Sequence, residues 1–367
     1  MDRPRATITI PKDAAAHPES NLEWWYCYAF VNGSGGKRYA LMISFFRVGE
    51  LPRLKGHYLI YSLIRLDDPR FIARSMLDRS LTVQMTGLYL PSYFLFKPGD
   101  AHTWEQYGTL LQGKLPPPHA WTQDVSVRSR PTSLRYGRAA ELIFKDDKSQ
   151  EFTLRIHDRE ARIELDFSPC KPLTVVDEIG TLNGLYYYSS TRNTVKGRIH
   201  HEEGSEQLSG EGWFDHQWGR NYELLKGEGW NWFGLQLDDG RELLISQMHV
   251  AKTDSPPAPP TALLILKDRA MITVNNIKMQ PLRYWNSDKS GMTYPIEWHV
   301  TIPHYRIELH VCPVIDNQEM PIVGPIRAIW EGACTVTGID HGNHARIKGR
   351  GFVELAGYAK YVKYAKP

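Results

Sequence analysis

The sequence predicts an all-β protein built from two similar units. An aromatic run at residues 23–30 returns about two hundred residues later at residues 229–237. Each run ends in a turn rich in Gly, Asn and Asp, which tolerate positive φ, and an apolar run follows. Helical periodicity is scarce along the chain. A repeat of this length favours two β units over a short-period solenoid.

Short apolar or alternating runs predict the individual strands in order. Gly, Asp or Pro turns separate several of them at hairpin spacing. The best helical candidates are short, at residues 74–79 and 100–111, and the proline-rich segments 116–121 and 255–260 are expected to be exposed loops. The predicted strands are residues 39–46, 58–64, 140–144, 152–156 and 162–167, then 243–248, 263–266, 296–300, 306–311 and 351–355.

The chain is long enough for two domains. Its 367 residues can form two hydrophobic cores, one for each copy of the repeat. The boundary is expected just before the second tryptophan-rich strand, around residues 220–228. The predicted units are therefore an N-terminal barrel or sandwich over residues 1–222 and a C-terminal one over residues 223–367.

The composition indicates which classes of binding partner are expected. The formal net charge of +3 comes from interspersed charges, so nucleic acid is not an expected partner. The 11 Trp and 19 Tyr suit a wall that contacts a hydrophobic ligand, although strands favour these residues in any case. The oligomeric state is not predicted by any of these features.

The termini and cysteines indicate a cytoplasmic protein. No stretch approaches the roughly 20 apolar residues of a membrane-spanning helix. Residues 1–7 lack the apolar segment of a signal peptide. The four cysteines (27, 170, 312 and 334) are scattered without a CxxC pair, so neither a disulfide framework nor a metal knuckle is predicted.

Several ordered blocks carry a family resemblance. They are His17-Pro18 with residues 23–26, then residues 44–47, 210–219, 229–240, 330–332 and 351–358. Together they resemble a lipocalin-like family that includes carotenoid 1,2-hydratases, AttH-like proteins labelled predicted secreted hydrolases, and related Diels–Alderase cyclases. The resemblance implies two tandem lipocalin-like (calycin) β-barrels with a hydrophobic ligand site in or between them.

Asp215 and His216 are the candidate catalytic pair, because these residue types donate and accept protons near neutral pH. Neighbours on a strand point to opposite faces, however, so the two are not expected to act on the same atom. A structural role for both is the alternative. The resemblance implies that hydratases of the family carry an aromatic-rich His block before the Asp-His pair and a Tyr-x-Asp further on. The corresponding places here are Gly-Trp-Phe at 212–214 and Ser-Gln-Met at 246–248, so the acid that would protonate an alkene is missing, which counts against simple carotenoid hydration.

Aromatic side chains from both copies of the repeat are the candidate ligand contacts. Trp25 and Trp232 are favoured because the repeat places them at equivalent positions. Alternation along the strand sends Trp24 and Trp25 to opposite faces, so only one of them can reach a ligand. The full predicted substrate-binding set is Trp25, Tyr26, Trp218, Tyr222, Trp230, Trp232 and Gln247.

Charged clusters are interpreted as structural. Glu23, Arg47 and Glu331 are expected to form a buried charge network rather than catalytic machinery. The histidines at residues 200–203 and 340–344 lie in polar turns, so no metal site is predicted. The sequence contains no GxSxG, HExxH or strand-linked GxGxxG motif, so no cofactor is expected and the hydrolase label has no support.

The function predicted from these features is a cofactor-independent cyclase or isomerase acting on a hydrophobic polyketide or terpenoid intermediate. Holding a flexible substrate in a reactive conformation would supply most of the rate enhancement. A hydratase that adds water to an isoprenoid double bond is the first alternative, with Asp215 or His216 as the acid. A lipid- or pigment-binding carrier without chemistry is the second.

Overall fold

A computed structural model describes residues 8–10, 12–68, 70–146, 148–182, 184–202, 204–222, 228–249 and 258–359. The chain divides into two compact units, Met1–Tyr222 and Glu223–Pro367. Strands dominate both, which confirms the all-β prediction. That each unit folds as an independent domain stays a prediction. Within the described ranges, no helix has the length and apolar character needed to cross a membrane.

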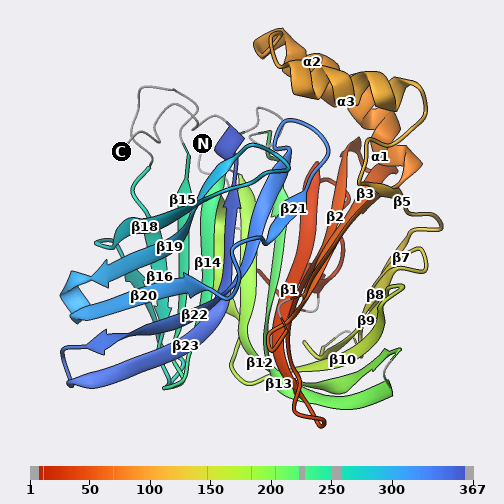
Figure 1. The fold of residues 1–367 in the computed structure, drawn as a ribbon. Coiled ribbons are helices and arrows are strands. Elements are labelled where there is room, and N and C mark those ends of the chain that lie inside the picture. The colour runs from red at the N-terminus through yellow and green to blue at the C-terminus, as the bar shows by residue number, and fades with distance from the viewer. Residues whose placement is uncertain are drawn as a thin grey trace. The chain divides into compact units, whose positions relative to one another are not determined.

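The first unit is one curled sheet whose strands pair antiparallel, except for the parallel contact of β4 with β5 (Figure 1). Its order is β5-β4-β3-β2-β1-β13-β12-β10-β9-β8-β7-β6, with β11 paired to β12. The strands are β1 (Leu22–Gly33), β2 (Arg38–Leu51), β3 (Leu54–Arg65), β4 (Arg70–Leu77), β5 (Ala120–Trp121), β6 (Ser126–Ser129), β7 (Thr132–Tyr136), β8 (Ala140–Phe144), β9 (Phe152–His157), β10 (Ala161–Pro169), β11 (Thr174–Leu182), β12 (Leu185–His201) and β13 (Gly204–Gly219).

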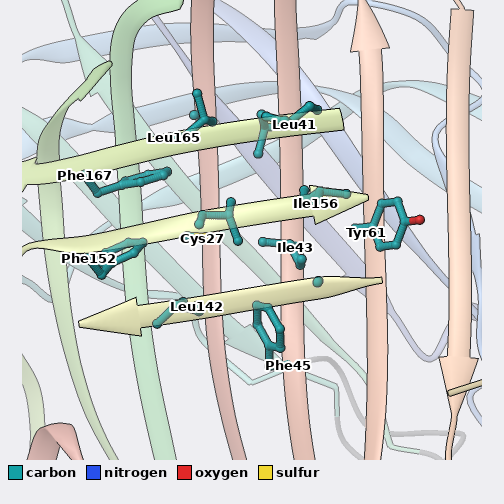
Figure 2. Packing of buried hydrophobic residues seen from close by; sticks show 14 of the residues in the cluster. Cys27, Leu41, Ile43, Phe45, Tyr61, Leu142, Phe152, Ile156, Leu165 and Phe167 are labelled. Atoms are coloured by element: carbon teal, nitrogen blue, oxygen red, sulfur yellow. The ribbon is translucent and has the colours of Figure 1, made fainter. Parts of the chain in front are cut away.

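Curling brings the two halves of this sheet face to face over one hydrophobic core. Figure 2 shows Cys27, Ile43 and Tyr61 from β1, β2 and β3 opposite side chains of β8, β9 and β10. The contributing residues alternate along each strand, because successive side chains point to opposite faces. On β1 the core residues are Trp25, Cys27, Ala29 and Val31, so the even-numbered residues of β1 lie on the second face of the sheet.

Helices follow β4 and project from one end of this unit (Figure 1). They are α1 (Arg79–Gln84), the π-helical turn η2 (Met85–Tyr89), α2 (Leu90–Phe96) and α3 (Ala101–Leu111), with a 3-10 turn η1 (Lys12–Ala14) earlier in the chain. Asp78 and Asp100 accept backbone N–H groups at the starts of α1 and α3. The predicted helix at 100–111 is confirmed. The one at 74–79 is wrong, because β4 pairs with β3 through Leu77 and the helix begins only after Asp78.

The second unit is another curled antiparallel sheet, with the order β17-β16-β15-β14-β23-β22-β20-β19-β18 and β21 paired to β22. A short 3-10 turn, η4 (Pro303–Tyr305), links β19 to β20. The strands are β14 (Trp230–Leu237), β15 (Glu242–Met248), β16 (Thr261–Ile265), β17 (Met271–Val274), β18 (Lys278–Asn286), β19 (Thr293–Ile302), β20 (Ile307–Pro313), β21 (Glu319–Pro321), β22 (Ala328–Asp340) and β23 (Ala345–Ala356).

The two hairpins that carry the repeat match through their turns. The N–H of Gly33 donates to the Lys37 carbonyl at 2.7 Å, and the N–H of Leu237 donates to the Arg241 carbonyl at 2.9 Å. This match pairs Trp232 with Tyr28, not with Trp25. The predicted equivalence of Trp25 and Trp232 is therefore wrong, because the hydrogen bonds of the turns, and not residue type, fix the register of the two hairpins.

The two tryptophans accordingly lie on opposite faces of their sheets. Trp25 belongs to the core of the first unit, whereas the core of the second unit takes Phe233 and Leu235 from β14. The ring of Trp232 lies on the other face, over Gly234. A Cβ at Gly234 would come within 2.3 Å of that ring, so only glycine leaves room for it.

Candidate functional site

The strand β13 carries the candidate pair on two different faces. It runs between β1 and β12, with Asp215 opposite Tyr26 on one side and Ser189 on the other. His216 is the next residue, so it points to the core face, where it is fully buried. The two residues are thus separated by the sheet, as strand alternation predicts.

Asp215 accepts three side-chain hydrogen bonds on the second face of the sheet. The Tyr187 hydroxyl donates to Oδ2 at 2.7 Å, and the Ser189 hydroxyl donates to Oδ1 at 2.5 Å. The indole N–H of Trp213 donates to the same Oδ1 at 2.6 Å. All three donors are neutral, and they hold the carboxyl group in one orientation.

Aromatic rings surround this carboxyl group on the same face. Tyr26 and Tyr28 lie on β1, and Tyr28 stacks at 6.0 Å and 18° on Trp213 of β13. Tyr26 meets Tyr28 edge to face at 6.4 Å. These side chains are almost completely buried, as is Asp215 at 2% exposure. Asp215 is therefore a buried carboxyl group that is surrounded by aromatic side chains.

The environment favours the protonated form of Asp215. Burial raises the pKa of the Asp215 carboxyl from its ordinary 3.8 to about 7, although the hydrogen bonds from Ser189, Tyr187 and Trp213 work in the opposite direction. Burial wins because the donors carry no charge and bring no Coulomb attraction. A carboxyl group with this pKa is suited to general acid–base chemistry near neutral pH.

His216 belongs to a separate polar cluster on the core face. Its Nε2 lies 3.0 Å from Oε1 of Glu23, and its Nδ1 lies 3.3 Å from the Tyr188 hydroxyl. Nδ1 of His17 lies 2.8 Å from the same Glu23 oxygen. A carboxylate oxygen and two imidazole nitrogens therefore converge within 4.8 Å of one another.

Hydrogen-bond partners keep the Glu23 carboxylate ionised, although burial lowers the pKa of one of them, His216. Burial alone would raise the pKa of Glu23, but the hydrogen bonds and charges of His17 and His216 lower it to about 2. Arg47 adds an ion pair to Oε2 at 3.3 Å. The predicted charge network of Glu23 and Arg47 thus exists within the first unit. Glu331 lies in the second unit on β22, opposite Glu354, and its side chain is buried.

Stacked rings hold the histidines of this cluster in place. His17 stacks on Trp218 at 4.1 Å and 4°, and His216 stacks on Trp25 at 4.6 Å and 18°. Trp25 and Trp218 therefore pack inside the core of the first unit. In this arrangement they position the histidines, and they do not share a face with Asp215.

The other predicted contacts are dispersed. Tyr222 is 41% exposed, and its hydroxyl contacts Glu50 and Arg220 at the surface. In the second unit, Trp230 is half-buried and Trp232 is buried on β14. Gln247 accepts from Asn231 and donates to the Ala258 carbonyl, both at 3.0 Å. Of the predicted ligand contacts in the first unit, Tyr26 lies beside Asp215.

Sequence reasoning missed the residues that define both environments. Tyr187 and Ser189 come from β12, where pairing with β13 brings them to Asp215. His17 precedes β1, and the sequence indicates it only as part of a family block. The one available signal was alternation on β13 itself, which places Trp213 on the same face as Asp215.

A cavity of about 180 Å³ lies elsewhere in the first unit. Apolar side chains such as Leu63, Ile72 and Ile199 line it together with Arg65 and Arg70. Neither Asp215 nor His216 belongs to its lining. It is therefore distinct from both polar clusters of β13.

Comparisons with known proteins agree on the fold. A sequence profile of the AttH-like family matches residues 114–358. A search of curated proteins found no relative of the chain.

Three solved structures superpose over nearly the whole chain. An AttH protein from Nitrosomonas europaea is 21% identical with a TM-score of 0.72, covering 97% of this chain and 98% of its own. Kievitone hydratase from Nectria haematococca is 13% identical with a TM-score of 0.67, covering 97% and 94%. CghA in complex with Sch210972 is 10% identical with a TM-score of 0.53, covering 97% of each chain. At identities this low, the superpositions establish the fold alone. They confirm the prediction of an all-β protein with two tandem barrels.

Proposed function

Because the chain belongs to the AttH-like family, we propose that it is an enzyme that acts on a hydrophobic, unsaturated small molecule through Asp215. The buried carboxyl group of Asp215, held by Tyr187, Ser189 and Trp213 among aromatic rings, is the observation that carries the proposal. Aromatic surface favours an apolar ligand, and the oriented carboxyl group supplies the polar contact.

The reaction that fits this site best is hydration of a carbon–carbon double bond. Asp215 gives its proton to one alkene carbon, water adds to the other carbon, and the proton that this water loses returns to the carboxylate. No cofactor is needed for this balance. The sequence prediction ranked hydration second because residues 246–248 lack an acid, and Asp215 supplies one from β13 instead. One structural neighbour is a hydratase, although likeness of fold does not determine chemistry.

Cyclisation is the second candidate, and the aromatic layer beside Asp215 favours it. Tyr26, Tyr28 and Trp213 offer flat surfaces on which a polyene chain can fold into a reactive shape. In that case Asp215 would donate a hydrogen bond to a conjugated carbonyl and would give up no proton. The structure of CghA has the same fold.

Isotope labelling separates the two reactions. Purified protein is incubated with isoprenoid, polyphenol and polyketide alkenes in ¹⁸O-labelled water, and products are followed by mass spectrometry. Hydration adds the mass of one labelled water, whereas cyclisation leaves the mass unchanged. Absence of turnover for a compound that binds tightly would favour the carrier alternative and sink the enzyme proposal.

The variant Asp215→Asn tests the role of the proton. Loss of a general acid lowers kcat by roughly 10²–10⁴-fold. An asparagine amide still donates a hydrogen bond, so a cyclase would retain most of its rate. Asp158→Asn is the matched control, since Asp158 also accepts from a tyrosine hydroxyl, that of Tyr61, at 2.7 Å. Equal kcat in the wild type and Asp215→Asn would exclude proton donation by Asp215.

A further inference from the structure

The cluster on the core face of β13 has the composition of a metal site. His17 Nδ1 and His216 Nε2 lie 2.8 Å and 3.0 Å from the same Oε1 of Glu23. Two imidazoles and one carboxylate with a fourth position open to water are a donor set that zinc uses in proteins. Of the residues that the structure describes, these three form the group whose ligand atoms come together closely enough to hold an ion.

The spacing of the ligand atoms suits a small cation. Zinc bonds of about 2.0–2.2 Å in a tetrahedron put neighbouring ligand atoms roughly 3.3–3.6 Å apart. The two nitrogens already lie near that distance from the Glu23 oxygen, and all three atoms are within 4.8 Å of one another. To seat the ion, the two nitrogens, now 2.8 Å and 3.0 Å from Oε1, would move away from that oxygen until each reaches this spacing.

The surrounding contacts are those that support metal ligands. A ligating histidine usually donates its second N–H to a carboxylate or another fixed acceptor, which orients the ring. Here Nε2 of His17 lies 3.3 Å from Oδ1 of Asp13, and Nδ1 of His216 lies 3.3 Å from the Tyr188 hydroxyl. The stacked rings of Trp218 and Trp25 fix both imidazole planes.

Access and charge are also favourable. Glu23 and His216 are buried, but the His17 side chain is 20% exposed, so an ion can enter from the His17 side. Arg47 approaches the other oxygen of Glu23, Oε2, at 3.3 Å, whereas Oε1 receives the two imidazole nitrogens and also the backbone N–H of His17 at 3.0 Å. The ligands come from the segment before β1, from β1 and from β13.

We propose that His17, Glu23 and His216 bind one divalent cation of the zinc class. The ion would join the segment that carries His17 to the central strands of the first unit. This proposal does not rest on the proposed function, because Asp215 lies on the opposite face of the sheet.

Cobalt titration of the full-length protein tests the site. Protein stripped with a chelator is titrated with Co²⁺, whose visible absorption reports tetrahedral nitrogen and oxygen ligation, and Zn²⁺ is then added as competitor. We expect one Co²⁺ for each chain, displacement by one Zn²⁺, and a higher melting temperature with either metal. A wild-type protein that takes up no Co²⁺ at millimolar concentration would overturn the proposal.

Single-residue variants assign the ligands. His17→Gln and Glu23→Gln are each expected to weaken binding by more than the roughly 10- to 100-fold that loss of an outer partner costs. His57→Gln is the control, because the His57–Asp78 pair at 2.7 Å is a histidine–carboxylate contact in the same unit without a second imidazole. Circular dichroism confirms folding of each variant. Wild-type affinity in a folded His17→Gln protein would also refute the site.

Discussion

Two buried carboxyl groups, Glu23 and Asp215, lie on opposite faces of the sheet around β13, and their pKa values are shifted in opposite directions. On the core face, two imidazoles and a guanidinium contact the buried Glu23 carboxylate, and its pKa falls to about 2. On the second face, the donors that Asp215 meets within the described part of the chain are hydroxyl and indole groups, and burial raises its pKa to about 7. Both groups are buried to a similar degree. Burial alone therefore does not decide the charge of a carboxyl group, because the hydrogen bonds and charges of its partners can outweigh it.

Removing the Glu23 carboxylate should produce the largest loss of stability. Glu23→Ala leaves Arg47 and two imidazoles without their shared acceptor, and breaking a buried ion pair from one side costs about 3–5 kcal/mol. Urea unfolding of metal-free protein measures this loss. Asp67→Ala is the control, since Asp67 pairs with Arg38 at the surface and its removal should have little effect. Similar midpoints for both variants would contradict a charged cluster on the core face.

The pH dependence of stability should reveal the raised pKa of Asp215. The folded protein holds this proton more tightly than the unfolded chain, so the resulting stability is complete below pH 3.8 and is lost as pH rises through about 7. At 1.36 kcal/mol for each pKa unit, the loss amounts to about 4 kcal/mol. Asp215→Asn cannot titrate and should show no such decline.

Unfolding free energies of both proteins between pH 4 and pH 8 measure this difference. The quantity of interest is the wild-type value minus the Asp215→Asn value at each pH, because this cancels all other titrating groups. A difference that does not change with pH would mean that Asp215 is ionised throughout, as Glu23 is.

Part of this contrast was accessible from the sequence. Alternation predicts the strands and places Asp215 and His216 on opposite faces, and their contacts confirm that placement. The identity of the partners was not accessible. Glu23 reaches His216 across 193 residues, and Ser189 reaches Asp215 only because of the register of β12 against β13. A register error of one residue would have exchanged the two faces.

The repeat shows where pattern matching failed. Matching the tryptophans by type aligned Trp25 with Trp232, although the hydrogen bonds of the turns align Trp232 with Tyr28. Side chains of one type can occupy either face of a strand, whereas turn geometry fixes the register. Backbone hydrogen bonds were the more reliable guide, and they are not visible in the sequence.

Two serines on β12 sharpen the comparison between charged and neutral acceptors. Ser189 donates to the Asp215 carboxyl group at 2.5 Å, and Ser190 donates to the Asn193 amide oxygen at 3.0 Å. A hydrogen bond to a charged group contributes about 1.5–3 kcal/mol and a neutral one about 0.5–1.5 kcal/mol. At pH 8, Ser189→Ala should therefore cost more than Ser190→Ala. The difference between the stability losses of the two variants should be smaller at pH 5, where Asp215 is protonated. A difference that stays the same at both pH values would argue against titration of Asp215.

The smallest effect is expected at Tyr222, which the sequence assigned to the ligand site. Its hydroxyl accepts from Arg220 at 2.9 Å and donates to Glu50 at 3.0 Å, and both contacts are at the surface. Tyr222→Phe should change stability by no more than about 0.5 kcal/mol and leave KM unchanged. Tyr187→Phe removes a hydroxyl that touches Asp215 directly, so it should lower kcat while the protein stays folded. A rise in KM with Tyr222→Phe, together with no change in kcat with Tyr187→Phe, would contradict this proposal. The ligand would then bind at Tyr222, as the sequence predicts, and not beside Asp215.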